Sequence, residues 1–274
     1  MTEAVSDHYN EPDLLARIER AIGAIDRTPD TITIEEMAPL EAFHIGGRAA
    51  TAALIPGLEI EESDGVLDIG CGTGGVARYV AHRYGCHVDG VDLTRNFIEA
   101  GKTISSWLNL TRKVRLHCDS ALSMPFEEEI FDAAYMFHVG MNIAEKGELF
   151  SEVKRVLKPG GRLLVYDIMR AGDETTPLSF PLPWASEPGA SHVRAAERYE
   201  THLEQAGFTI HHIKPRRDLA DPFFDRLEEN KGKPPPALGT ATLMGRTAPE
   251  KIANLLAAYR KDQIVPVEIL ARKP

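Results

Sequence analysis

The sequence predicts an α/β fold built on a doubly wound, mostly parallel sheet. Strand-like and helix-like stretches alternate from residue 63 to residue 140, which is the pattern of consecutive βαβ units. A short apolar stretch at 66–69 leads into a glycine-rich turn and then into a helical stretch. In sheets of this kind the ligand binds at the carboxyl ends of the strands, where the strand order reverses. These observations predict a ligand site at the glycine turn.

The glycine turn follows the apolar run Val66 to Ile69, which carries a single acid, Asp68. Four of the next six residues are glycine: Gly70, Gly72, Gly74 and Gly75. Glycine is needed where the backbone takes positive φ or where a ligand approaches it closely. The helical stretch at 75–84 begins at the turn, and a helix N-terminus presents unpaired N–H groups to a polar ligand. The turn therefore favours a bound ligand over a plain connection.

The glycine spacing alone does not identify that ligand. Gly70, Gly72 and Gly75 fit the dinucleotide pattern G-x-G-x-x-G, whereas Gly70, Gly72 and Gly74 fit G-x-G-x-G. Cys71 lies inside the turn, where a small residue suffices, so we favour a structural over a nucleophilic role for its thiol. The context of the turn has to decide between the ligands.

Composition and charge narrow the class of protein. The chain has 274 residues and a formal net charge of −10, which argues against a broad phosphate-binding surface and a nucleic-acid partner. No apolar run approaches the roughly 20 residues of a membrane helix, and the polar, acidic N-terminus shows no secretory signal. Three cysteines without C-x-x-C spacing suggest a reducing compartment. We expect a cytoplasmic enzyme that acts on a small molecule.

The elements that follow from periodicity and from turn residues are these. Residues 1–62 form an N-terminal extension with helical stretches at 12–25 and 33–40, and then Phe43 to Arg48 ahead of an alanine-rich stretch at 49–54. Strands are expected at 66–69, 87–91, 114–117, 131–137, 162–169, 208–213 and 264–270. Helices are expected at 75–84, 96–108, 145–157, 195–206 and 249–259, and the segment at 221–228 is helix-like. Pro159-Gly160-Gly161 is expected to stop the helix at 145–157.

Two irregular stretches interrupt the alternation, at about 170–193 and within 215–260. Long irregular connections inside a compact domain are usually lids or mobile segments, and we interpret both as a substrate cover on the domain at 63–274. Four aromatic residues could line an apolar pocket there or merely pack: Phe180, Trp184, Phe223 and Phe224. The segment Phe43 to Arg48 could likewise approach a ligand or cap the sheet edge.

Several motifs in order resemble those of class I S-adenosylmethionine-dependent methyltransferases. They are Val66 to Gly75 (VLDIGCGTGG), Asp92 ending the second strand, Met124-Pro125-Phe126 with Phe131-Asp132, and Leu157 to Val165 (LKPGGRLLV). The stretches His138 to Ile143 (HVGMNI) and Pro181 to Pro188 (PLPWASEP) resemble the branch with ubiquinone/menaquinone, tocopherol and sarcosine/dimethylglycine methyltransferases. The resemblance covers roughly residues 60–214.

The resemblance implies a Rossmann-like sheet of seven strands whose last strand is antiparallel, with S-adenosyl-L-methionine as the cofactor. It also bears on the glycine ambiguity, because this family commonly has an acid where Asp68 stands and dinucleotide folds usually have an apolar residue there. A nicotinamide-dependent oxidoreductase is kept as the alternative. So is a protein that binds the cofactor without turnover.

The resemblance assigns cofactor contacts to the glycine turn and to the ends of the next strands. In the turn they fall on Asp68, Gly70, Cys71, Gly72 and Gly74. The carboxylate of Asp92 can accept hydrogen bonds from both ribose hydroxyls, although it could instead cap the next helix, a role that Thr94 could also fill. Leu93 is expected against the adenine, and Asn96 is a weaker candidate.

The third strand departs from the family pattern, which has an acid at the position of Ser120 to bind the adenine amino group. Either the Ser120 hydroxyl replaces that carboxylate or Asp119 reaches round. We favour Ser120 with the backbone of Ala121, and keep Asp119 in reserve.

Phe137 and His138 end the fourth strand, where the family places the methionine end of the cofactor and the methyl acceptor. His138 is the first candidate for a general base, with His44 and Tyr9 from the N-terminal extension as further candidates, although His138 could also be a packed ring. No metal-ligand spacing is present, so no metal is expected. Methyl transfer needs a base only if the acceptor must lose a proton. The sequence therefore leaves open the small-molecule acceptor, the methylated atom (N, O or C) and the oligomeric state, for which a homodimer is one expectation.

Overall fold

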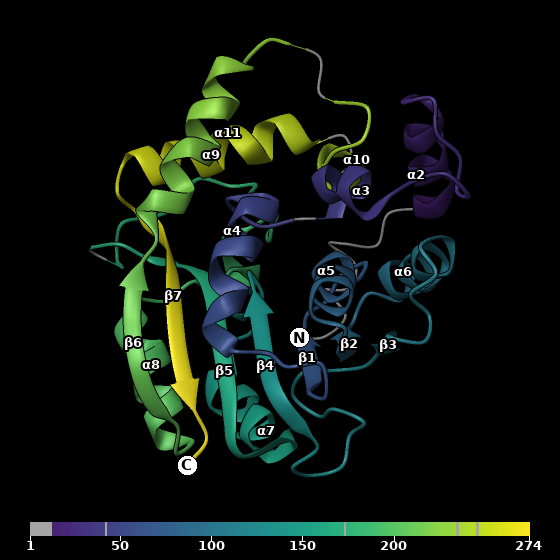
Figure 1. The fold of residues 1–274 in the computed structure, drawn as a ribbon. Helices are drawn as coiled ribbons and strands as arrows, with labels where there is room; N and C mark the ends of the chain where they lie inside the picture. Colours follow the sequence, from purple (N-terminus) through teal and green to yellow (C-terminus); the bar gives the residue numbers. More distant parts are fainter. Residues whose placement is uncertain (1–12, 42, 173, 234–235, 245–246) are drawn as a thin grey trace.

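A seven-stranded sheet forms the centre of the protein, with its strands in the order β3-β2-β1-β4-β5-β7-β6 (Figure 1). The computed structural model describes residues 13–41, 43–172, 174–233, 236–244 and 247–274. The strands are β1 (Gly65–Ile69), β2 (His87–Asp92), β3 (Val114–Cys118), β4 (Phe131–Phe137), β5 (Leu157–Arg170), β6 (Thr209–Pro215) and β7 (Ile264–Arg272). All seven expected strands are present.

The first five strands of the sheet run parallel to one another, and β7 runs antiparallel between β5 and β6. The prediction of a mostly parallel sheet with an antiparallel last strand is therefore confirmed. The strand order reverses between β1 and β4, which pair in parallel with Ile69 opposite Met136. A crevice is expected above the carboxyl ends of strands at such a reversal.

Helices cover both faces of the sheet, and they connect or precede the strands as the periodicity predicts. They are α2 (Leu14–Gly23), α3 (Ile34–Glu41), α4 (Gly47–Leu54), α5 (Gly75–Tyr84), α6 (Arg95–Trp107), α7 (Lys146–Val156), α8 (Ala196–Gln205), α9 (Arg217–Glu229), α10 (Ala241–Met244) and α11 (Ala248–Arg260). Three short 3-10 turns lie at Ile55–Leu58, Gly140–Asn142 and Pro188–Ala190.

Alternate residues of β1 serve the two faces of the sheet, as the pleat requires. Val66 packs into the core that α4 and α5 cover, whereas Leu67 and Ile69 pack into the core that α7 and α8 cover. Because both faces are buried, this strand is a nearly continuous apolar run. The one acid in it, Asp68, is therefore buried too, with 3% of its surface exposed.

Strand β5 begins earlier than the expected start at residue 162. Helix α7 ends at Val156 and the chain turns at once into extended backbone at Leu157, so Pro159-Gly160-Gly161 lies inside β5 instead of merely stopping the helix. Backbone hydrogen bonds tie this stretch to the end of the chain, because Gly160 N donates to Lys273 O and Lys273 N donates to Gly161 O. The stretch between Leu157 and Arg162 disturbs the register against β4.

The N-terminal extension packs above α6. Leu14, Ile18 and Ile22 of α2 share one apolar core with Phe97 and Ile104 of α6. Leu238 and Leu243, from the second irregular stretch, complete the same core. Figure 1 shows α2, α3 and α10 grouped at the end of the sheet toward which β1 and β4 point. Segments far apart in the sequence thus meet near the strand reversal.

Both irregular stretches also reach this end of the sheet. They follow β5 and β6, which are parallel to each other because each is antiparallel to β7. Trp184 from the first stretch shares a buried core with Phe224 of α9 and Tyr259 of α11. The helix-like segment expected at 221–228 is longer in the structure, since α9 runs through Pro222 from Arg217 to Glu229. Their role as a substrate cover stays a prediction.

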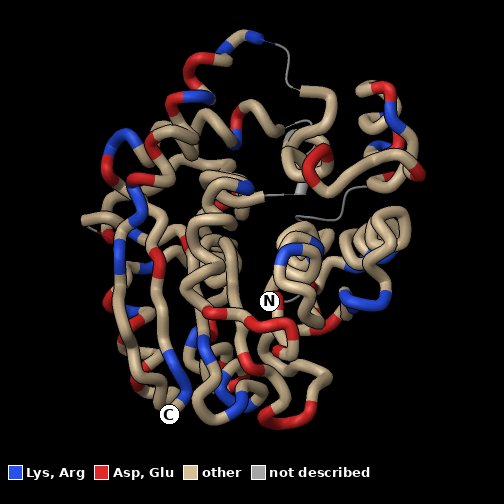
Figure 2. Tube along the Cα trace, in the orientation of Figure 1, with Lys and Arg blue, Asp and Glu red and all other residues tan. Residues whose placement is uncertain are grey.

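Charged residues are spread over the outer helices and loops, with acidic and basic side chains interleaved along the chain (Figure 2). Among the helices of the described residues, none is long and apolar enough to span a lipid bilayer.

Candidate functional site

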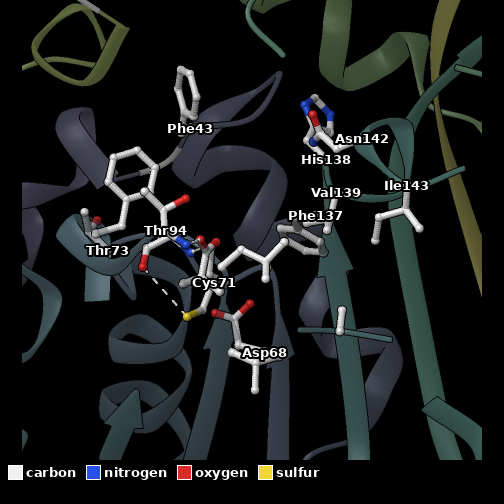
Figure 3. Close-up of a pocket in the computed structure, with 18 of the residues that line it drawn as sticks. Phe43, Asp68, Cys71, Thr73, Thr94, Phe137, His138, Val139, Asn142 and Ile143 are labelled. Atoms are coloured by element: carbon white, nitrogen blue, oxygen red, sulfur yellow. Dashed lines mark hydrogen bonds between the residues drawn. The ribbon is translucent and has the colours of Figure 1, made fainter. Parts of the chain in front are cut away.

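A cavity with about 1180 Å³ of unfilled space opens at the carboxyl ends of β1, β2 and β4 (Figure 3). Its walls come from the glycine turn, from the loops that follow β2, β3 and β4, and from the N-terminal extension. The residues that line it are Phe43, His44, Asp68, Gly70, Cys71, Gly72, Thr73, Val76, Val91, Asp92, Leu93, Thr94, Phe97, Asp119, Ser120, Ala121, Leu122, Phe137, His138, Val139, Asn142, Ile143 and Leu243. We call it the cofactor cavity.

The glycine turn takes the backbone conformation that its sequence predicts. Gly70, Gly72 and Gly74 have φ of 69°, 53° and 80°, which is the left-handed region that glycine enters without strain. A Cβ at Gly70 would lie 2.3 Å from Cγ2 of Val139, whereas a Cβ at Gly72 would meet only a Phe97 carbon at 3.9 Å. Gly70 therefore permits close packing, and Gly72 leaves backbone open to the cavity.

Asp92 holds two parts of the cavity wall together. Its carboxylate accepts hydrogen bonds from Gly72 N at 2.9 Å and from Thr94 N at 2.8 Å. Thr94 is the N-cap residue of α6, but its own side chain makes no capping bond. Burial raises the pKa of Asp92 even though these N–H groups favour the carboxylate. The same acid thus braces the glycine turn and the start of α6 while it faces the cavity.

Asp68 presents a buried carboxylate oxygen to the cavity without a protein partner. No hydrogen bond reaches its Oδ2, which is buried. Burial raises the pKa of Asp68 to about 7, and the neighbouring Asp92 charge adds to the shift. A buried carboxylate oxygen without a hydrogen bond is costly unless a donor joins it. This oxygen is therefore suited to a cationic group of a ligand.

The loop after β3 brings all three candidate residues to the cavity. Asp119, Ser120 and Ala121 each line it. The Ser120 hydroxyl accepts a hydrogen bond from Leu122 N at 3.1 Å, and Asp119 N donates to Asp92 O at 3.2 Å. These bonds fix the loop but leave both Ser120 and Asp119 as predicted partners of an adenine amino group.

The structure brings His138 and His44 together, although they lie in different parts of the chain. Their ring centroids are 6.0 Å apart in an edge-on arrangement. His138 directly follows β4 and has a φ of 57°, and its buried Nε2 has no hydrogen-bond partner. Nε2 of His44 hydrogen-bonds with Gly47 O at 2.9 Å and with the Thr51 hydroxyl at 3.0 Å.

Both imidazoles are neutral at ordinary pH. Burial lowers the pKa of His44 to about 4. Burial, with a further contribution from His44, holds the pKa of His138 well below its usual range. A neutral imidazole can both donate and accept a hydrogen bond. The pair therefore offers uncharged polar groups to a ligand in this part of the cavity wall, near Phe137 and Asn142.

Some candidates lie elsewhere. Gly74 and Asn96 are not among the lining residues: Gly74 is the N-cap of α5, and Phe97 takes the place in the wall that was expected for Asn96. Arg48, four residues after His44, lies over the ring of Tyr79, with its guanidinium carbon 4.6 Å from the ring centroid. Tyr9 lies outside the described residues. Within the described parts of the chain, no group of three His, Cys, Asp or Glu could hold a metal ion.

Several lining residues were missed by the sequence reasoning. Thr73 and Asn142 lie within motifs that were recognised, so their position could have been inferred. Phe97 follows Asn96 by one residue, and helical spacing alone did not show which of the two faces the cavity. Leu243 on α10 reaches the cavity only because the second irregular stretch folds back over the cavity. No local sequence pattern predicts this position of Leu243.

Comparison with known proteins identifies residues 67–165 as a methyltransferase domain. Sterol 4-C-methyltransferase strm-1 of Caenorhabditis elegans is 34% identical over 116 residues, which cover 42% of this chain and 34% of that protein. The chain spans only between 29% and 59% of the length of the first curated relatives that it matches.

Solved structures share the fold. Geranyl diphosphate C-methyltransferase from Streptomyces coelicolor aligns with a TM-score of 0.67 at 21% identity, over 82% of this chain and 80% of that one. The cyclase SpnF aligns with a TM-score of 0.68 at 21% identity, over 100% of this chain and 97% of that one.

The matched region contains the glycine turn, Asp92 and His138, and it decides the ambiguity of the glycine spacing against the nicotinamide alternative. Residues 67–165 of this chain therefore match the methyltransferase-domain family.

Proposed function

We propose that this protein transfers a methyl group from S-adenosylmethionine to a small-molecule acceptor. The observation that carries the proposal is the cofactor cavity, in which the glycine turn, the Asp92 carboxylate and the partnerless Oδ2 of Asp68 meet at the strand reversal. This cavity lies within the matched methyltransferase domain.

The residues present fit that cofactor. The backbone open at Gly72 and the carboxylate of Asp92 suit a ribose, whose hydroxyls are hydrogen-bond donors. The buried oxygen of Asp68 suits the positively charged ammonium of the methionine part. Leu93 and Phe97 offer apolar surface to the adenine ring, and Ser120 or Asp119 with the backbone of Ala121 offer polar atoms to its edge. When bound, S-adenosylmethionine supplies an activated methyl group on its sulfonium sulfur.

The task of the protein itself is alignment and exclusion of water. Holding two reactants in line raises their effective concentration to about 10⁵ M or more. Phe137 and Val139 are apolar residues of the cavity wall. His138 and His44 are neutral polar residues in the same wall. We propose that these two histidines face the acceptor, and His138 remains the first candidate to take up an acceptor proton. A role for Tyr9 as a general base remains a prediction.

The acceptor cannot be copied from the relatives, because their names include sterol, tocopherol and phosphoethanolamine methyltransferases. We further propose that the protein works in the cytoplasm without a nucleic-acid partner. The net charge of −10 and three free cysteines support this. A homodimer is also proposed, and light scattering of the purified chain tests it.

Calorimetry with S-adenosylhomocysteine, the demethylated cofactor, tests the assignment. We expect micromolar binding, and Asp92→Ala should weaken it about 100-fold or more, because each hydrogen bond to a charged group contributes about 1.5–3 kcal/mol. Asp89→Ala is the matched control, since Asp89 lies on the same strand but pairs with His117 outside the cavity. Undiminished affinity in Asp92→Ala with the fold intact would contradict the proposal.

The second candidate function is cofactor binding without methyl transfer. It is supported by the alignment to the cyclase SpnF over the whole described chain, which shares the fold without being named a methyltransferase. Turnover separates the two candidates. A methyltransferase incubated with S-adenosylmethionine and a pool of small metabolites releases S-adenosylhomocysteine, whereas a non-catalytic protein binds the cofactor and releases none.

A further inference from the structure

A second cavity, with about 690 Å³ of unfilled space, adjoins the cofactor cavity. The two share three wall residues, Phe43, His44 and His138. The pair of neutral histidines therefore lies between the two cavities and lines both of them. A ligand in it would face the cofactor across His138. We call this second cavity the acceptor chamber.

The walls of the acceptor chamber come from parts of the chain that are distant in the sequence. Trp184 belongs to the first irregular stretch, Phe223 and Leu227 belong to α9, and Leu255 belongs to α11. Ile168, at the end of β5, forms its base. Both segments that the sequence marked as a substrate cover, together with the N-terminal extension, therefore enclose one space.

The chamber is apolar and carries no charged side chain among the described residues that line it. Its polar side chains are the two histidines and Thr240. The indole N–H of Trp184 is already used, because it donates to the Ser191 hydroxyl at 2.9 Å. A charged group that entered this space would lose its hydration without gaining a counter-ion. The chamber therefore excludes phosphates and carboxylates and suits apolar surface.

One polar atom in this wall lacks a partner. Nε2 of His138 is buried and makes no hydrogen bond with the protein. His138 is held in place by its own backbone, since its N–H donates to Tyr166 O at 2.8 Å. With the ring proton on Nδ1, Nε2 is an acceptor, and a buried acceptor left unsatisfied costs about 1–3 kcal/mol. A donor on the ligand would recover that cost.

We propose that the acceptor chamber binds an uncharged, largely apolar compound through a hydroxyl group that donates a hydrogen bond to Nε2 of His138. The description of this compound as the methyl acceptor rests on the proposed function, but its binding does not.

The test uses N-phenyl-1-naphthylamine, an uncharged apolar fluorophore that brightens when it leaves water, bound to the full chain at pH 7.5. Three competitors of similar shape are compared: 1-naphthol, 1-methoxynaphthalene and 1-naphthyl phosphate. We expect 1-naphthol to displace the probe about tenfold more tightly than its methyl ether, because one recovered hydrogen bond contributes about 1 kcal/mol or slightly more. The phosphate should not compete.

Two charge substitutions on α9 locate the binding. Leu227→Lys places an ammonium in the chamber wall and should weaken probe binding about tenfold or more. Glu229→Lys adds the same group to the same helix at an exposed position away from the chamber, and should leave probe binding unchanged. Neither substitution touches the cofactor cavity, so both proteins should keep the affinity for S-adenosylhomocysteine.

Two substitutions of His138 test the hydrogen bond. His138→Phe keeps a ring without an acceptor, and His138→Asn suits the left-handed backbone but is too short to replace Nε2. Both should bring the affinities for 1-naphthol and its methyl ether within twofold of each other. An equal preference in the native protein, or tight binding of the phosphate, would overturn the inference.

The outcomes separate this inference from the proposed function. Binding of 1-naphthol that responds to Leu227→Lys supports the chamber even if S-adenosylhomocysteine fails to bind. Binding of S-adenosylhomocysteine with no displacement of the probe by 1-naphthol refutes the chamber and leaves the proposed function standing.

Discussion

The cofactor cavity and the acceptor chamber differ in how the chain builds them. Most of the cofactor cavity comes from successive strand ends and loops between β1 and the turn after β4. The acceptor chamber draws its walls from the N-terminal extension, β5, the first irregular stretch, α9 and α11. The first contains the carboxylates of Asp68 and Asp92, whereas the second has no charged side chain among its described lining residues.

The two cavities therefore depend on different kinds of sequence information. The cofactor cavity is built by residues that are close together in the sequence, so their order largely sets its geometry. The acceptor chamber is built by segments that are distant in the sequence, so its geometry depends on how those segments pack. The two spaces share the wall residues Phe43, His44 and His138. Substitutions can therefore disturb either space alone or both at this boundary.

The largest effect is expected from Gly70→Ala, which acts on the packing of the glycine turn in the wall of the cofactor cavity. The new Cβ would lie 2.3 Å from Cγ2 of Val139 on a backbone with φ of 69°. Left-handed backbone costs alanine about 1–2 kcal/mol and overpacking about 1–3 kcal/mol. We expect the free energy of unfolding to fall by about 2–5 kcal/mol, with loss of S-adenosylhomocysteine binding, measured by urea unfolding and calorimetry.

Gly23→Ala is the matched control for this substitution. Gly23 ends α2, and a Cβ there would meet nothing within 4 Å. Alanine is the better helix former by about 1 kcal/mol, so the control should leave stability unchanged or slightly higher. A Gly70→Ala protein as stable as this control would show that Gly70 is not packed closely against Val139.

A smaller effect is expected from Asp68→Asn, which acts on the cofactor cavity alone. The pKa of Asp68 is raised from 3.8 to about 7, so the folded protein keeps a proton that the unfolded chain has lost. The stability from this group is present below pH 4 and is lost as the pH rises through 7, by at most about 4 kcal/mol. The asparagine variant should lack this fall, as urea unfolding at pH 5 and pH 8 would measure.

The same variant should bind S-adenosylhomocysteine more weakly at pH 8, because the carboxylate is no longer available to the ammonium group. Probe binding in the acceptor chamber should be unchanged. An identical pH dependence in native and variant proteins would rule out Asp68 as the titrating group.

The smallest effect is expected from His44→Asn, which acts on the acceptor chamber. Burial lowers the pKa of His44 from 6.5 to about 4. Between these two pH values, His44 is protonated in the unfolded chain and neutral in the folded protein. The stability present above pH 6.5 is therefore lost as the pH falls toward 4, by at most about 3 kcal/mol. Without this imidazole, the loss between pH 7 and pH 5 should shrink, as urea unfolding would measure.

The asparagine at position 44 should also weaken N-phenyl-1-naphthylamine binding by a few-fold, because the ring contributes to the chamber wall. Affinity for S-adenosylhomocysteine should stay within about twofold, since one hydrogen bond or less is at stake. A large loss of cofactor affinity would instead show that His44, which lines both cavities, contacts the cofactor.

The sequence by itself determined the sheet and the cofactor cavity. The alternation of apolar runs and helical periodicity placed all seven strands, and the glycine turn with Asp92 placed the crevice, because these signals depend on neighbouring residues. Among the cofactor candidates, Gly74 and Asn96 do not line the cavity, because the direction of a residue at a helix end depends on the rotation of that helix. Their contact with the cofactor stays a prediction.

Only the tertiary structure decided the acceptor chamber. Of the aromatic residues considered for an apolar pocket, Trp184 and Phe223 line it, while Phe224 stacks on Tyr259 with ring centroids 4.3 Å apart. His44 meets His138, and Leu243 reaches the cofactor cavity, through contacts between distant parts of the chain. No local pattern encodes such meetings, because they follow from how whole segments bury their apolar faces against one another.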